Sequence, residues 1–294
     1  MHSLKFWGWG VRWLRDSSLW PKRSTTMKRT WVKTTCALQE GQKENFFLWL
    51  SEFKIEGAWE LDEQTVMVYS REPLPEPPAL FVKKWQKEQE EEEEWGEKWR
   101  EYFKTIRIDE ELVIRPPWEK KTRARFDIVI YPAYAFGTGH HPTTEGCLRF
   151  IKKYFREGLS FLDLGVGSGI LSILALKMGA CRVCAVDIDP LAIEEVERNL
   201  TLNGIDISKV ELLLGDIATV GGEFDFIVAN IGPYFHLEYL PKMQRLLTGK
   251  GKILLSGFEV QDLPPIEEKI HQVGLTVLDA MVLSSWVSLV CQNS

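Results

Sequence analysis

Short apolar runs alternate with amphipathic stretches through the second half of the chain. Apolar residues at every third or fourth position predict helices, whereas short runs of aliphatic residues predict strands. The predicted helices span residues 142–155, 170–178, 190–203, 235–247 and 259–272. The predicted strands span residues 160–164, 182–187, 210–214, 224–230, 252–257, 276–282 and 287–291. This alternation predicts an α/β fold with a mainly parallel sheet covered on both faces.

The first third of the chain has a different pattern, typical of a small α+β unit. Three predicted strands span residues 30–38, 55–61 and 65–69. A helix is predicted between the first two, because apolar side chains recur at i, i+3, i+4 and i+7. These side chains are Phe46, Trp49, Leu50 and Phe53.

Prolines at positions 73, 75, 77 and 78 predict a stiff boundary after this unit. We expect a helix over 79–106, with an acidic middle at 90–94 and a repeat of Trp95, Trp99 and Phe103 at its end. Two more predicted strands, 112–115 and 126–131, lead to the larger domain. The predicted organisation is a basic extension (1–26), a small docking domain (27–72), an acidic helical linker (73–111) and the α/β domain (112–294).

Charge is unevenly distributed along the chain. The net charge is −6, but residues 1–35 hold eight basic side chains and one acidic, and residues 86–111 hold five basic and eleven acidic. The basic start fits a disordered arm, a mitochondrial-type presequence or a start codon placed too early, and an arm of this kind can contact nucleic acid. We do not expect direct RNA contact.

Bulk features exclude several classes of protein. No apolar run approaches the roughly 20 residues that cross a bilayer, and no secretory signal is present. Five cysteines are an odd number for a disulfide framework, which favours a reducing, cytoplasmic location. We expect no metal site, because neither Cys181 with Cys184 nor His140 with His141 has a second ligand pair at a known spacing.

The strongest local motif is the loop Asp163-Leu164-Gly165-Val166-Gly167-Ser168-Gly169, which ends a predicted strand and opens a helix. Glycines in such a loop let a ligand approach the backbone. A dinucleotide fingerprint would need glycine where Ile170 stands. The observed spacing, with an acid two residues before the first glycine, resembles the S-adenosylmethionine loop of class I methyltransferases.

Acidic side chains follow the next two predicted strands. Asp187 ends the first, where a carboxylate can accept hydrogen bonds from both ribose hydroxyls of an adenosyl group. Asp189 is the better helix cap, which would leave Asp187 free for this role. Asp216 could accept from the adenine amino group while Ile217 packs on the ring, although a simple turn residue is the alternative.

Asn230 and Ile231 end the fourth predicted strand, at the edge where doubly wound folds bind ligands. An amide there can orient an attacking nitrogen. The stretch from Asn230 to Tyr234 is similar to the Asn-Pro-Pro-Tyr of nucleobase and glutamine methyltransferases. It differs by one inserted residue and by Ile231 in place of the first proline.

Residues 27–291 resemble the PrmA family, bacterial methyltransferases of large-subunit ribosomal protein eleven. The string Phe136-Gly137-Thr138-Gly139 followed by His141-Pro142-Thr143-Thr144 carries most of this resemblance. The glycine loop, the Asp187–Pro190 segment and the Val228–Ile231 segment add to it. Trp95, Trp99, Pro117-Trp118 and Ser285-Trp286-Val287 are also similar to family features.

The resemblance implies a class I, Rossmann-like, seven-stranded domain, a ferredoxin-like N-terminal domain that docks the ribosomal protein, and a helical linker. It implies methylation of lysine ε-amines and of the N-terminal α-amine, with S-adenosyl-L-methionine as cofactor, by a monomer. It also implies contacts to that cofactor at Phe136, Gly137, Thr138, Thr144, Asp163, Gly165, Val166, Gly167, Ile170, Asp187, Ile188 and Asn230.

Three alternatives remain at this point. The short N-terminal region is weakly matched, so the substrate could be the lysines of another protein, such as an electron-transfer flavoprotein subunit. The basic arm and Tyr234 would suit a nucleic-acid amino-methyltransferase. A non-catalytic ribosome assembly factor is the third possibility, although it need not retain the glycine loop, Asp187 and Asn230 together.

Overall fold

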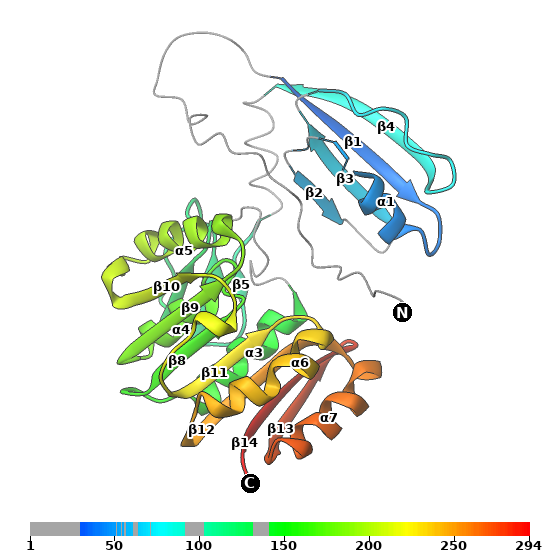
Figure 1. The fold of residues 1–294 in the computed structure, drawn as a ribbon. Helices are drawn as coiled ribbons and strands as arrows, with labels where there is room; N and C mark the ends of the chain where they lie inside the picture. The colour runs from blue at the N-terminus through cyan, green and yellow to red at the C-terminus, as the bar shows by residue number, and fades with distance from the viewer. Residues whose placement is uncertain are drawn as a thin grey trace. The chain divides into compact units, whose positions relative to one another are not determined.

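The computed structural model describes residues 30–50, 52–53, 55, 57–60, 64–70, 72–91, 103–131 and 141–294. The chain divides into two compact units, residues 1–102 and Phe103–Ser294 (Figure 1). Each unit is described by itself. Within the described residues, no helix is long and apolar enough to cross a membrane.

The larger unit is built on a seven-stranded sheet in the order β10-β9-β8-β11-β12-β14-β13. The first five of these strands are mutually parallel, and β14 is antiparallel to both of its neighbours. The strands are β8 (Ser160–Leu164), β9 (Arg182–Asp187), β10 (Val210–Leu214), β11 (Phe224–Asn230), β12 (Leu247–Glu259), β13 (Leu275–Leu283) and β14 (Trp286–Asn293). The predicted α/β fold is confirmed, and the bounds of β8 to β11 are those predicted.

Helices cover both faces of this sheet (Figure 1). On one face, α3 (Pro142–Tyr154), α4 (Ile170–Lys177) and α5 (Pro190–Leu202) enclose a buried cluster that includes Phe161, Phe226 and Leu254. On the other, α6 (Pro233–Arg245) and α7 (Leu263–Gln272) enclose a second cluster. Because both faces are buried, the interiors of the central strands are almost entirely apolar.

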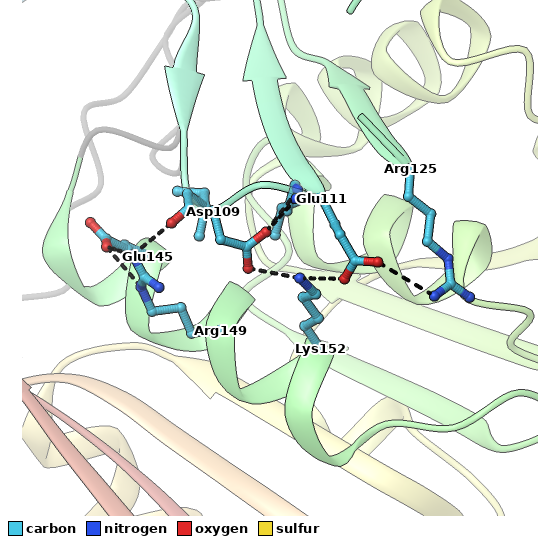
Figure 2. Close-up of polar contacts among 8 residues, drawn as sticks. Asp109, Glu111, Arg125, Glu145, Arg149 and Lys152 are labelled. Carbon is cyan, nitrogen blue, oxygen red and sulfur yellow. Dashed lines mark hydrogen bonds and ion pairs between the residues drawn. The ribbon is translucent and has the colours of Figure 1, made fainter. Parts of the chain in front are cut away.

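A second, three-stranded sheet of the larger unit packs on the first of these clusters. Its strands are β5 (Ile106–Arg107), β6 (Leu112–Arg115) and β7 (Phe126–Val129), in that order. Charged side chains tie it to α3, as Figure 2 shows: Lys152 Nζ lies 2.8 Å from Asp109 Oδ2 and 2.7 Å from Glu111 Oε2. Arg149 donates to the carbonyl of Ile108 at 2.7 Å.

The smaller unit is a four-stranded antiparallel sheet, ordered β2-β3-β1-β4, with α1 (Lys43–Leu50) on one face. Its strands are β1 (Thr30–Leu38), β2 (Gly57–Glu60), β3 (Thr65–Ser70) and β4 (Val82–Glu91). Phe46 and Leu50 of α1 are fully buried in its core. Among described residues the unit has the strand order of a ferredoxin-like fold, but residues 72–81 form bends and turns where that fold has its second helix.

The predicted helix over 79–106 is wrong in its described parts. Val82–Glu91 is strand β4, paired with β1 so that Trp85 lies opposite Cys36, and Ile106–Arg107 is β5. A register shift near Ala37 and Leu38 breaks the period-two pattern of β4, and its Glu, Lys and Gln residues favour helices in isolation. Pairing with β1 overrides that propensity. The predicted 73–111 linker therefore contributes a strand to each unit.

Candidate active site

The crevice between β8 and β11 is where the order of the parallel strands reverses. From β8 the chain proceeds outward to β9 and β10, and then returns to β11 and β12 on the other side. In open α/β sheets ligands bind at this switch point, beyond the carboxyl ends of the strands. The loops after β8, β9, β10 and β11 meet here, and they hold most of the described residues expected from the sequence to bind a ligand.

The loop after β8 depends on glycine. Gly165, Gly167 and Gly169 all have positive φ, at 69°, 52° and 79°. A Cβ on Gly165 would lie 2.8 Å from the Ile231 side chain, and one on Gly169 would lie 3.2 Å from Val196. The loop is therefore packed against the segment after β11 on one side and against α5 on the other.

Asp187 ends β9 with its carboxylate already engaged by the backbone. Its Oδ2 accepts from the Gly167 N–H at 3.0 Å, and its Oδ1 accepts from the Asp189 N–H at 3.0 Å. Asp189 caps α5, as predicted, by accepting from Leu191 N–H at 2.9 Å. Asp187 is therefore not the helix cap, as predicted, and each of its carboxylate oxygens retains a second acceptor site beside the backbone bond. The two bonds fix the direction in which those sites point.

The apolar residues expected around an adenine ring differ sharply in exposure. Ile188 is 75% exposed, whereas Ile217 is 2% exposed and belongs to the core between the sheet and α6. Asp216 accepts from the Ala218 N–H at 2.8 Å and caps a short 3₁₀ helix, which is the turn role considered above. Ile188 therefore offers far more surface to a flat ring than Ile217 does.

Asn230 supplies an acceptor that has no partner. Its Oδ1 is buried and has no hydrogen-bond partner among the described residues. A buried amide oxygen left unpaired costs about 1–3 kcal/mol, so such atoms indicate a missing ligand group or water. Thr144, in the first turn of α3, has a buried Oγ1 in the same condition.

The Asn230-Ile231 segment is held from β12. The Ile231 N–H donates to the Ser256 carbonyl at 3.1 Å, and His236 Nε2 lies 2.8 Å from the same oxygen, so that nitrogen carries the proton. Gly257 has φ 93°, and a Cβ there would lie 2.5 Å from the Ile231 carbonyl oxygen. Complete burial lowers the pKa of His236 to about 4, so the ring is neutral near pH 7.

Asp163 links the end of β8 to the start of α4 and so supports the glycine loop between them. It is 1% exposed, and its Oδ2 accepts from both the backbone N–H (3.1 Å) and the hydroxyl (2.6 Å) of Ser172 in α4. Burial raises the pKa of its carboxyl to about 7. Val166 and Ile170 are also buried, in the core with α3 and α4, so their side chains brace the loop.

Three residues expected to bind the cofactor are not described by the structure. Phe136, Gly137 and Thr138 lie outside the described residues. The N-cap of α3 is His141, whose Nδ1 accepts from the Thr143 N–H. The supporting residues His236, Ser256 and Gly257 were not anticipated. A glycine inside a strand pattern is the signal that could have indicated the close approach at Gly257.

The fold and the switch-point loops define a class I methyltransferase domain. The chain belongs to the PrmA family, whose model, described as "Ribosomal protein L11 methyltransferase (PrmA)", matches residues 23–294. It is 36% identical over 206 residues to the ribosomal protein L11 methyltransferase of Bacillus subtilis (strain 168), and 35% identical over 202 residues to that of an Exiguobacterium species.

These two alignments cover 68% of this chain, but 65% and 64% of the respective relatives, so the chain spans just under two thirds of their length. A solved structure is also similar, the ribosomal protein L11 methylase from Lactobacillus delbrueckii subsp. bulgaricus. It matches with a TM-score of 0.62 and 32% identity, over 65% of this chain and 100% of that one.

Proposed function

We propose that the protein transfers methyl groups from S-adenosyl-L-methionine to lysine ε-amines and to the N-terminal α-amine of ribosomal protein L11. Family membership supports this reading, as do the names of the relatives. The observation that carries it is the buried Oδ1 of Asn230, which has no partner among the described residues. The next residue, Ile231, packs its side chain against Gly165 of the glycine loop. An amine N–H is a donor that Asn230 Oδ1 could accept from.

The described residues fit the cofactor group by group. The remaining acceptor sites of Asp187 suit the two ribose hydroxyls, and the exposed Ile188 suits one face of the adenine ring. Gly165 and Gly167 leave the backbone accessible to the methionine part. Thr144 Oγ1 is a second buried oxygen without a partner among the described residues, and by motif we assign it to the cofactor as well. By motif, we assign Phe136, Gly137 and Thr138 to the same cofactor.

The chain's own contribution to the chemistry is alignment. The bound cofactor supplies an electrophilic methyl group, and an amine that attacks it must be neutral and in line with the bond that breaks. A lysine amine has an unperturbed pKa of about 10.4, and burial away from water favours its neutral form. Asn230 Oδ1 and the Ile231 carbonyl are the two oxygens we assign to orienting the nitrogen, and Ser256 and Gly257 hold them in place.

Methyl-transfer assays test the proposal directly. Purified protein is incubated with methyl-labelled cofactor and either ribosomal protein L11 or ribosomal RNA. We expect label in the protein fraction only, and an Asn230→Ala variant should lose about 100-fold or more of the rate at saturating cofactor. Label in RNA would instead identify a nucleic-acid methyltransferase, and no label in either would favour another protein substrate or a non-catalytic binding protein. An unchanged rate in Asn230→Ala would rule out the orienting role.

A further inference from the structure

Asn199 of α5 and Asn203, the C-cap residue of that helix, bind the backbone at the end of β7 and just beyond it, and only Asn199 also binds the glycine loop. Asn199 and Asn203 lie one helical turn apart. Asn203 Oδ1 accepts from the Val129 N–H at 3.0 Å, and its Nδ2 donates to the Val129 carbonyl at 2.6 Å. Asn199 Oδ1 accepts from the Tyr131 N–H at 2.9 Å. The spacings match, because four helical residues rise roughly 6 Å and two strand residues advance roughly 6.6 Å.

These two amides supply hydrogen-bond partners to the outer edge of β7. β7 is the outer strand of the β5-β6-β7 sheet and pairs only with β6 within it. Its outward backbone groups would otherwise need other partners. The two asparagine side chains thus take the place of a neighbouring strand at Val129 and Tyr131.

Asn199 has a second connection that Asn203 lacks. Its Nδ2 donates to the carbonyl of Ser168 at 2.8 Å, and the residue is 1% exposed. Ser168 lies between Gly167, which donates to Asp187, and Gly169, which packs against Val196 one turn earlier on the same helix. One buried carboxamide therefore joins the glycine loop after β8 to the chain at Tyr131.

Neither half of this amide can be replaced without loss. The carbonyl at Ser168 needs a donor and the N–H at Tyr131 needs an acceptor, and a carboxamide is a small side chain that supplies both. Asparagine is also a weak helix former, so its presence inside α5 is unfavourable unless the side chain has a role.

We propose that Asn199 is a positioning residue for cofactor binding, one that fixes the glycine loop after β8 relative to the chain at Tyr131. The residue does not touch the cofactor. It sets the position of the loop that carries Gly165 and Gly167, both assigned above to the cofactor. This inference rests on the proposed function, because it takes those assignments as given.

The test compares Asn199→Asp with the matched variant Asn203→Asp. Each exchange keeps the acceptor oxygen and removes the donor. Calorimetric titration with S-adenosylhomocysteine should give a dissociation constant at least tenfold higher for Asn199→Asp, and within twofold of wild type for Asn203→Asp. Equal affinities for wild type and Asn199→Asp would overturn the proposal, and so would equal weakening by both variants, which would indicate general destabilisation.

A second measurement needs no variant and covers the case in which Asn199→Asp does not fold. Hydrogen exchange of the Tyr131 amide in the wild-type protein should slow at least tenfold when S-adenosylhomocysteine is bound. If the exchange rate of the Tyr131 amide does not change on binding, the positioning role of Asn199 is wrong and the proposed function still stands. A wild-type protein that binds no S-adenosylhomocysteine would instead overturn the proposed function, and the positioning role with it.

Discussion

The two units bury their sheets differently, and this difference governs where chemistry can lie. In the larger unit helices cover both faces of the seven-stranded sheet, so polar groups that could bind a ligand are concentrated at the strand ends. In the smaller unit α1 covers one face, and the other holds the ion pair of Lys33 with Glu88 beside the buried side chains of Met67 and Tyr69. The larger unit positions a site by its loops, whereas the second face of the smaller sheet is mixed polar and apolar.

The largest expected effect is a loss of stability in the smaller unit that leaves cofactor binding by the larger unit unchanged. Phe46→Ala removes a fully buried ring from the small core and should cost about 3–5 kcal/mol of its stability. Because the described site residues all lie in the larger unit, the affinity for S-adenosylhomocysteine should change less than twofold. Calorimetric melting and titration measure both quantities. A parallel loss of affinity would show that the larger unit depends on the smaller one. The control is Lys33→Ala, which removes an ion pair and should change stability little.

A smaller effect is expected from Gly257→Ala, within the site. The added Cβ would collide with the Ile231 backbone, and the positive φ adds strain. We expect the methyl-transfer rate to fall about 100-fold, which corresponds to about 2.7 kcal/mol. Gly274→Ala is the matched control, since Gly274 has φ 75° but open space around its Cβ position. Similar rates for the two variants would contradict the role of close approach.

Asp187→Ala tests the loop after β9. It removes a charged acceptor, so we expect the dissociation constant for S-adenosylhomocysteine to rise about 10- to 100-fold. Asp189→Ala, two residues later, removes only the α5 cap and should cost about 1 kcal/mol of stability with unchanged affinity. Titration calorimetry on both variants distinguishes the roles. Affinity within twofold of wild type for Asp187→Ala would exclude the ribose assignment.

The smallest effect is a change in pH dependence. The pKa of the buried Asp163 carboxyl is raised to about 7, against about 3.9 when unfolded, so its contribution lowers stability as pH rises from about 4 to 7. His236 acts oppositely, because its pKa of about 4 lies below the unfolded value of about 6.5, and its contribution is lost as pH falls through that range.

In Asp163→Asn only the histidine contribution remains. Its free energy of unfolding should therefore rise from pH 4.5 to 6.5, by at most about 1.4 kcal/mol per pH unit, while that of the wild type stays flatter. Urea titrations at several pH values measure this slope. The same slope in variant and wild type would contradict the assignment to Asp163.

Sequence patterns were most informative for the parallel sheet. The bounds of β8, β9 and β11 follow from short, mostly apolar runs, and so do those of the less buried edge strand β10. The loop residues Gly165, Asp187 and Asn230 follow from their positions at strand ends. β4 was misread because its sequence is mostly Lys, Glu and Gln and its stability comes from pairing with β1. Contacts between distant segments, such as Gly257 with Ile231 or Asn199 with Tyr131, have no local signature and needed the structure.

The position of β14 has a consequence for synthesis of the protein. Among the seven strands it is made last, yet it lies between β12 and β13, and the Ser256 hydroxyl donates to its Val287 carbonyl at 2.9 Å. A ribosome adds about 5–20 residues per second, so β12 waits a few seconds with an unpaired edge. The Ser256 hydroxyl lacks its Val287 acceptor in that interval. The sheet is therefore completed last, by the insertion of β14 between two strands made before it.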